Sequence, residues 1–172
     1  IAYSYNGINW TGKGQSLFPT QGVYGVAWNG YMWVVAGAGG VHALAYSSDG
    51  INWTGLGISI FSDDGRGVAW NGKMWVAVGT GSTHTLAYSY DGISWTGLGK
   101  TIFSSTGQGV AWNGTRWVAG GNGTNTLAYS SDGINWTGLG NSSIATTGRN
   151  IASTVAPNLN PASDNGIPNP RF

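Results

Sequence analysis

The sequence predicts an all-β fold assembled from four-stranded antiparallel units, and three observations lead to this prediction. The phrase AYSSDGINWTG, or a close variant of it, begins at Ala2, Ala45, Ala87 and Ala128. A second phrase, GVAWNG followed by a Trp-Val pair, recurs every 42 residues between these copies. Both phrases combine aromatic and β-branched residues with glycines that mark turns. Neither phrase shows a 3.6-residue apolar period, which argues against helix. Repetition at this spacing is typical of folds built from supersecondary units.

The first hairpin of a unit can be predicted from the copy that begins at Gly67. Residues 67–70 form a short β-prone run. The Asn-Gly dipeptide at 71–72 follows, and its tolerance of positive φ suits a two-residue hairpin turn. Residues 74–78 then return as the second strand, and glycines end it.

The second hairpin of the same unit follows after a short Gly-rich loop. Residues 85–89 are expected to form the third strand, the Asp-Gly dipeptide at 91–92 a tight turn, and residues 93–97 the fourth strand. Four strands in about 42 residues match the size of a β-propeller blade. One blade cannot bury both faces of its sheet, so each must stack on its neighbours. We therefore predict a β-propeller-like array in which the ten tryptophans pack between blades.

The repeats divide the chain into a repeat domain and a tail. The domain is expected to span residues 1–156, and residues 157–172 form a Pro/Asn-rich extended tail or linker. Two arrangements remain open: an N-terminal hairpin that completes a blade begun by the C-terminal strand, or a piece of a longer propeller or open array. Within the domain we expect a half unit at 1–19, full units at 22–61, 67–103 and 109–144, and a segment resembling a first strand at 148–155.

The composition excludes several classes of function. Charged residues make up 8% of the chain, the net charge is +1, and there is no basic run to attract phosphates. We therefore expect no nucleic-acid partner. No apolar stretch is long enough to insert into a membrane. The absence of cysteine excludes disulfides and thiolate metal sites, and no cofactor is expected.

One repeated motif resembles that of a known family. The run YSSDGINWT at 46–54 and again at 129–137 resembles the Asp box, or bacterial neuraminidase repeat, of β-propeller proteins. The repeats are also similar to those of uncharacterised proteins of giant viruses and environmental microbes. In the first copy Asn6 replaces the acid, and in the other three the Gly follows the Asp directly, so the turn should be tighter than the usual motif. The resemblance implies structural roles for Ser47, Asp49 and Trp53; for Ser89, Asp91 and Trp95; and for Ser130, Asp132 and Trp136.

Catalysis by this chain is not expected. An Asp before Gly in a tight turn most often accepts hydrogen bonds from its own backbone. A glycosidase needs two carboxyl groups in distinct environments roughly 5 to 10 Å apart. A sialidase resemblance would further imply an arginine clamp, a tyrosine nucleophile and a Glu, and the chain has no Glu. We predict no catalytic residues and no enzymatic activity, with part of a sialidase-like glycoside hydrolase as a distant alternative.

Two columns of variable residues are the candidate ligand-binding positions. His42 and His84 occupy equivalent positions that the third unit fills with Asn125. A zinc pair is conceivable, but the Asn favours ordinary loop residues, and no metal site is predicted. Asp63-Asp64 could attract calcium, but the other units do not repeat it, so a solvated loop is expected. The second column contains Arg66, Gln108 and Arg149, aligned with Tyr24, and is expected to face solvent or a ligand.

The expected function is that of a non-enzymatic repeat module of an extracellular or virion-surface protein. Equivalent polar loops around one face of a propeller suit lectin-like binding of glycans or of a surface protein. The alternative is a purely structural role as a spike, filament or capsid decoration. Self-association, or continuation into a larger repeat protein, fits either role.

Overall fold

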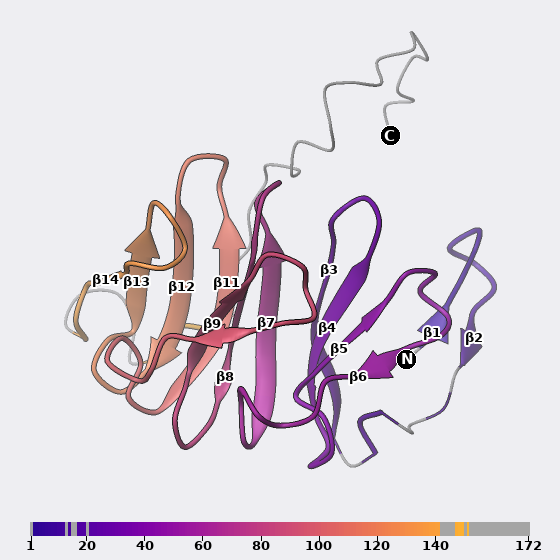
Figure 1. The fold of residues 1–172 in the computed structure, drawn as a ribbon, viewed down its shortest axis with the longest axis horizontal. Helices are drawn as coiled ribbons and strands as arrows, with labels where there is room; N and C mark the ends of the chain where they lie inside the picture. Colours follow the sequence, from indigo (N-terminus) through magenta and orange to yellow (C-terminus); the bar gives the residue numbers. More distant parts are fainter. Residues whose placement is uncertain are drawn as a thin grey trace, which may run out of the picture.

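The fold of the chain is all-β and propeller-like, with about 42 residues per repeat, as the sequence predicts. A computed structural model describes residues 2–12, 14, 17–19, 21–141, 147–149 and 151. In these residues fourteen strands lie side by side in antiparallel sheets (Figure 1). The described part of the chain contains no helix that could cross a membrane.

The strands group into one half unit and three complete units. Each complete unit has its four strands paired in chain order, first to second, second to third and third to fourth. The half unit is β1 (Ala2–Tyr3) and β2 (Thr11–Gly12); the first unit is β3 (Gly22–Trp28), β4 (Trp33–Ala38), β5 (Leu44–Ser47) and β6 (Thr54–Gly55); the second unit is β7 (Asp64–Trp70), β8 (Trp75–Thr80), β9 (Leu86–Ser89) and β10 (Thr96–Gly97); the third unit is β11 (Thr106–Trp112), β12 (Trp117–Asn122), β13 (Leu127–Ser130) and β14 (Thr137–Gly138).

The hairpin turn between the first two strands of a unit lies one residue later than predicted. Asn71 N donates to Met74 O at 3.2 Å, so Gly72 and Lys73 are the two central residues. The Asn71 side chain instead closes the turn, because its Oδ1 accepts from the backbone N of Lys73 and Met74 at 2.9 and 2.8 Å. Gly72 has a φ of 96°, which only glycine adopts without strain.

The fourth strand of a unit is shorter than predicted. The sequence predicts residues 93–97, whereas β10 contains only Thr96 and Gly97. The preceding residues belong to the turn, because the backbone N–H groups of Ile93 and Ser94 donate to the Asp91 carboxylate instead of to a neighbouring strand. The connection after the Asp-Gly dipeptide is therefore a wide loop closed by a side chain.

The first strand of each unit carries a β-bulge near its start. In the second unit the register between β7 and β8 shifts between Gly65 and Gly67, which leaves Arg66 as the extra residue. The same shift occurs at the equivalent positions in the first and third units. A bulge re-aims the side chain that it carries.

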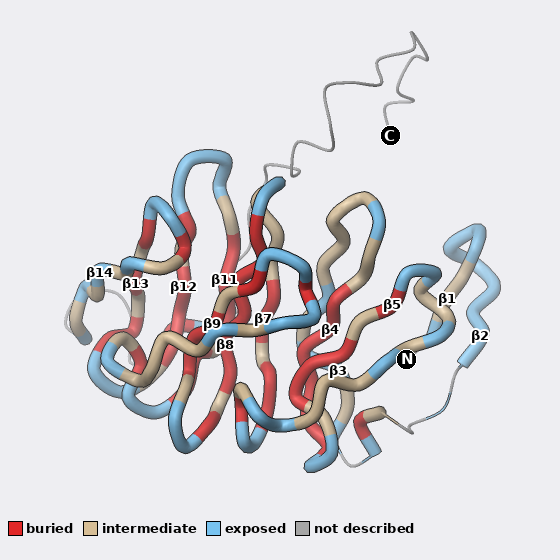
Figure 2. Tube along the Cα trace, in the orientation of Figure 1, coloured by how far each residue is buried: buried red, intermediate tan, exposed pale blue. Residues whose placement is uncertain are grey.

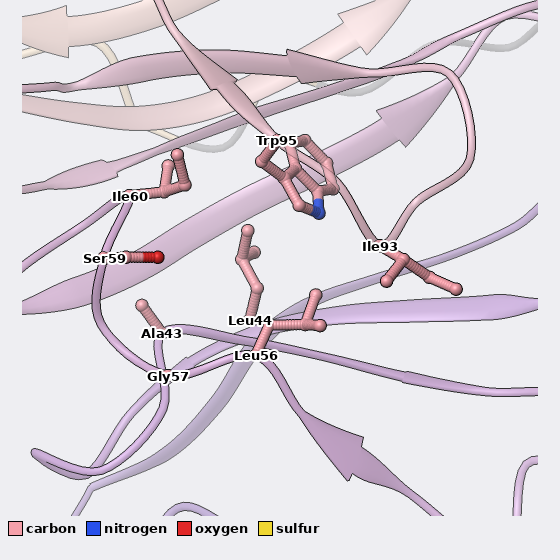
Figure 3. A pocket seen from close by; sticks show the side chains of 8 residues that line it. All are labelled: Ala43, Leu44, Leu56, Gly57, Ser59, Ile60, Ile93 and Trp95. Carbon is pink, nitrogen blue, oxygen red and sulfur yellow. The ribbon is translucent and has the colours of Figure 1, made fainter.

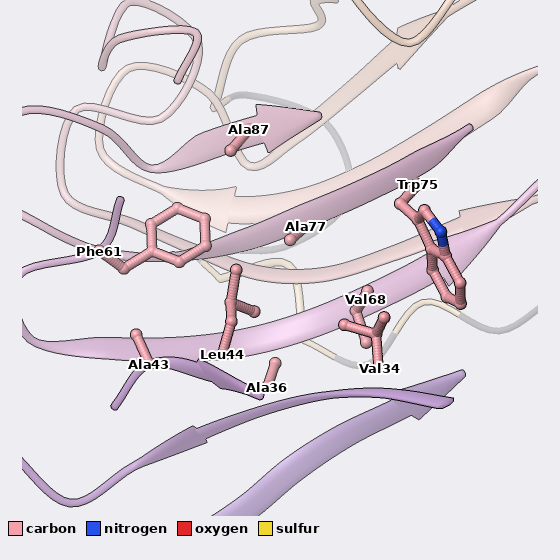
Figure 4. Packing of buried hydrophobic residues seen from close by; sticks show 9 residues of the cluster. All are labelled: Val34, Ala36, Ala43, Leu44, Phe61, Val68, Trp75, Ala77 and Ala87. Carbon is pink, nitrogen blue, oxygen red and sulfur yellow. The ribbon is translucent and has the colours of Figure 1, made fainter. Parts of the chain in front are cut away.

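The hydrophobic core lies between neighbouring units. Figure 4 shows the cluster between the first and second units, where Val34 and Leu44 of the first unit meet Trp75 of the second unit and Phe61 of the connection between the two. An equivalent cluster joins the second and third units around Trp117 and Phe103. Trp75 and Trp117 are completely buried, as expected for residues that pack between blades.

Glycines bring the first strands of successive units unusually close together. A Cβ added at Gly25 would lie 3.1 Å from the Gly67 Cα, and one added at Gly67 would lie 3.2 Å from the Gly109 Cα. These contacts fix the spacing of the units along their inner edge. Figure 2 shows how far each strand is buried. Strands β4, β7, β8 and β12 are largely buried, whereas β3 is exposed or half-buried along its length.

The described residues after the third unit continue the repeat pattern. Gly148 N donates to Gly121 O at 3.1 Å. An added Cβ at Gly148 would approach Thr126 O, as one at Gly107 would approach Thr85 O. Residues 150 and 152–155 of the predicted first-strand segment and the predicted tail at 157–172 lie outside the described residues.

Candidate functional site

The repeated Asp-Gly turns are closed by their own side chains. Ser47 Oγ donates to Asp49 Oδ1 at 2.9 Å, and the same Oδ1 accepts from the backbone N of Ile51 and Asn52 at 2.8 and 2.7 Å. Trp53 Nε1 completes the turn by donating to Gly50 O at 3.0 Å. The same set of bonds recurs around Asp91 and Asp132.

The half unit forms the same turn without a carboxylate. Asn6 Oδ1 accepts from Ser4 Oγ and from the backbone N of Ile8 and Asn9 at 3.1, 3.0 and 2.9 Å. One side-chain oxygen therefore suffices for the turn geometry. This observation assigns the Asp residues a structural role.

Hydrogen bonding also sets the protonation state of these carboxyl groups. The backbone N–H of Ser94 is the main cause that lowers the pKa of Asp91 from 3.8 to about 2. The pKa of Asp49 is lowered still further, mainly by the backbone N–H of Asn52, and that of Asp132 mainly by the Asn135 side chain. A general acid must be protonated near the working pH, so these three groups are poorly suited to that task.

The first predicted column stabilises loops by hydrogen bonds to their backbone. His42 Nδ1 accepts from Gly57 N at 2.9 Å, and His84 Nδ1 accepts from Gly99 N at 2.9 Å. In the third unit, Asn125 Oδ1 accepts from Gly140 N at 2.7 Å, while its Nδ2 donates to Ile102 O. The three side chains thus play one structural role, and their contact with a ligand stays a prediction.

The second predicted column forms a continuous surface across three units. Arg66 Nη1 donates to Gln108 Oε1 at 3.2 Å, and the Arg66 guanidinium lies 5.5 Å from the centre of the Tyr24 ring. We call Tyr24, Arg66 and Gln108 the bulge row, because each is the extra residue of a β-bulge. Arg149 follows Gly148 as Gln108 follows Gly107, and it is exposed.

A buried carboxylate holds the centre of the bulge row. Asp64 accepts from Arg66 Nε at 3.2 Å and from Nη2 at 2.7 Å, and its side chain is almost fully buried. The expectation of a solvated loop is therefore wrong for Asp64, which starts strand β7 and pairs with the bulged Arg66. Three of the five guanidinium N–H groups are engaged in these bonds, and one remains on each Nη.

One hollow outside the bulge row is too small for an ordinary ligand. A hollow of about 70 Å³ lies between the first and second units, beneath Trp95 (Figure 3). Its lining is aliphatic except for Trp95 and Ser59, and it is far smaller than the roughly 300 Å³ of ordinary ligand sites. No group of three or more metal-ligating side chains occurs in the described ranges.

Comparison with known proteins assigns no family. No protein-family model matches the chain, and no curated protein matches its sequence.

Proposed function

We propose that this chain is a non-enzymatic repeat module that binds glycans through the bulge row, on an extracellular or virion-surface protein. The observation that carries the proposal is the contact of Arg66 with both Gln108 and Tyr24, which joins side chains of three units into one surface. An aromatic face beside a guanidinium and an amide can stack on a sugar ring and bond its hydroxyl groups at the same time.

The rigidity of the row supports this function. Arg66 is fixed by the buried Asp64, so little side-chain entropy would be lost when a ligand binds. The loops next to the bulge row are less available, because some of their polar groups are bonded to each other. For example, Ser62 Oγ accepts from Ser82 N at 2.9 Å, and Ser104 Oγ accepts from Thr124 N at 3.0 Å.

Glycan binding can be tested with variants that leave Asp64 paired. A panel of neutral and acidic oligosaccharides would be screened on an array, and hits would be titrated by calorimetry. We expect Tyr24→Ala and Gln108→Ala to weaken binding at least about tenfold, a change of about 1.4 kcal/mol. Tyr31→Ala is the matched control, because Tyr31 is an exposed tyrosine outside the row. Equal loss in Tyr24→Ala and Tyr31→Ala, or no binding by the wild type, would refute the proposal.

The second candidate function is a purely structural role. It is favoured by the hydrogen bonds just described, which consume loop polar groups to join segments 20 residues apart. Under this alternative the wild-type chain binds no oligosaccharide but copurifies with a particle or filament.

A further inference from the structure

The side chain that holds the loop after the fourth strand is titratable in two units and not in the third. In every complete unit the backbone N–H of a glycine in this loop donates to a side chain about 15 residues earlier. The three bonds run from Gly57 N to His42 Nδ1 at 2.9 Å, from Gly99 N to His84 Nδ1 at 2.9 Å, and from Gly140 N to Asn125 Oδ1 at 2.7 Å. The geometry is shared, but the chemistry of the acceptor is not.

Each histidine can accept this bond only while its ring is neutral. A neutral imidazole has one acceptor nitrogen, which here is Nδ1, so its proton lies on Nε2. A protonated imidazole donates from both nitrogens, and its Nδ1–H would then face the backbone N–H of Gly57 or Gly99. Two donors in contact repel each other, so the bond is lost. The amide oxygen of Asn125 remains an acceptor at any ordinary pH.

Glycines on the fourth strands give the rings the space that they occupy. A Cβ added at Gly55 would collide with the His42 ring, and one added at Gly97 would collide with the His84 ring. Both rings are half-buried. The rings are therefore packed against the backbone of their own unit and are also open to protons from solvent.

Few charged groups surround the two rings. The segments around them are residues 17–19, 38–44 and 54–58 for His42, and residues 59–63, 80–86 and 96–100 for His84. The charged residues in these segments are Asp63 and Lys100, which have opposite signs and both belong to the surroundings of His84. Among the described residues the ion pair that occurs joins Arg66 to Asp64 and involves neither histidine. No carboxylate is therefore paired with either ring.

The loops held by the histidines cover the core between units. Leu56 and Ile60 lie on either side of Gly57 and pack against the cluster between the first and second units. The equivalent residues of the next loop, Leu98 and Ile102, pack against the cluster between the second and third units. The first of these loops also lines the hollow in Figure 3. Loss of the histidine bonds therefore weakens the cover of both clusters.

We propose that His42 and His84 form an acid-sensitive clasp, which releases the backbone N–H groups of Gly57 and Gly99 when the rings are protonated. Imidazole is the side chain that ordinarily changes charge between about pH 5 and pH 8. The folded loop requires the neutral ring, so the contribution of the bond is present at the upper end of this range and is lost as the pH falls. The carbonyl of Gly57 keeps its bond from Ala43 N at 2.9 Å, so the loop loosens without detaching. The clasp is independent of glycan binding.

Amide hydrogen exchange of the full chain, measured by NMR at about pH 7.5 and about pH 5 and corrected for intrinsic rates, tests the clasp. On acidification we expect the protection of the Gly57 and Gly99 amides to fall about tenfold, which corresponds to about 1.4 kcal/mol, the value of one hydrogen bond. The Gly140 amide is the internal control, because its acceptor is Asn125, and its protection should not change. Equal losses at the three glycines, or no loss at Gly57 and Gly99, would overturn the proposal.

Exchange of the two kinds of side chain separates the clasp from a general effect of acid. His84→Asn should keep the Gly99 amide protected at both pH values, because an amide oxygen then replaces Nδ1 as it does in the third unit. Asn125→His should make the protection of the Gly140 amide depend on pH. Thermal melting verifies that both variants fold, and the three amides of the wild type decide the question if a variant does not. Continued pH dependence at Gly99 in folded His84→Asn would refute the role of the ring.

Discussion

Individual side chains in this protein replace the regular backbone pairing that short strands cannot supply. Asp91 alone accepts two backbone N–H groups and the Ser89 hydroxyl, and it thereby orders a turn whose strands contain only two to four residues. A carboxylate in such a turn contributes stability only while it is ionised. The turn chemistry thus makes the stability of the fold depend on pH.

The acid limb of this dependence can be measured with Asp91→Asn. The pKa of Asp91 is lowered in the folded chain from 3.8 to about 2, so the contribution of the carboxylate is complete above about pH 4 and is lost as the pH falls toward 2. At pH 7 we expect Asp91→Asn to lower the free energy of unfolding by at most about 1 kcal/mol, since the site is solvent-exposed. Urea unfolding at several pH values should show this difference shrinking below about pH 4 and vanishing below pH 2. A difference that persists there would contradict the explanation.

At the scale of elements, glycines set how the first strands pack. A Cβ at Gly67 would be crowded by the Gly109 backbone on one side and by the Val78 side chain on another. These glycines were not needed for a turn, because no positive φ occurs at Gly67. Their role is the close approach of one unit to the next.

Gly67→Ala tests this role. The added Cβ would lie 3.2 Å from both Gly109 Cα and Val78 Cγ2, so the two units must separate slightly. We expect a loss of about 1 to 3 kcal/mol in the free energy of unfolding, as for other overpacked sites. Gly12→Ala is the control, because an added Cβ there meets no atom within 4 Å, and its effect should stay within about 0.5 kcal/mol. Similar losses in both variants would argue against close packing as the cause.

Some elements could be predicted from sequence and others could not. The 42-residue period gives the unit size, and the Trp-Val pairs mark the second strands that begin at Trp33, Trp75 and Trp117. The bulge at Arg66 breaks the alternation on which strand predictions depend, so the first strand is predicted too short. The sequence does not predict the wide loop after Asp91, because the hydrogen bonds of this loop come from a side chain rather than from strand pairing.

The candidate site was only partly visible in the sequence. Alignment of the repeats places Arg66 and Gln108 in one column, and the structure brings them into contact. The burial of Asp64 could not be predicted from its neighbour Asp63, which is exposed. The pattern that would have predicted this burial is an acid two residues before a bulged Arg on the same strand. The role of His42 was hidden because its bond to Gly57 spans 15 residues.

At the scale of the whole molecule, the hydrophobic core joins neighbouring units, and the first two units are also joined by the pairing of β4 with β7 at Ala38 and Asp64. Each core cluster contains residues from two neighbouring units, so the loss of one large side chain weakens two units at once. Nearest-neighbour coupling of this kind is characteristic of repeat proteins. The half unit shows the contrast, because Trp10 is 64% exposed.

Two tryptophan substitutions test this distribution of stability. Trp75→Ala removes a completely buried indole between the first and second units, and we expect it to lower the free energy of unfolding by about 3 to 5 kcal/mol. Trp10→Ala removes an exposed indole and should change it by no more than about 0.5 kcal/mol. Chemical denaturation followed by circular dichroism measures both. Comparable losses would show that the half unit contributes to the core as much as the complete units do.

The close contacts among Gly25, Gly67 and Gly109, which have no side chains, have a consequence for how such chains change in evolution. Each unit offers its successor the same contact surface, and it meets its predecessor through the same glycine. A gene segment encoding one whole repeat can therefore be duplicated or lost without new side chains at the junction. A change of length within one of these strands would put a Cβ against the neighbouring backbone and separate the units, so such changes should be confined to the loops, where the third unit is already one residue shorter between Trp117 and Ala128.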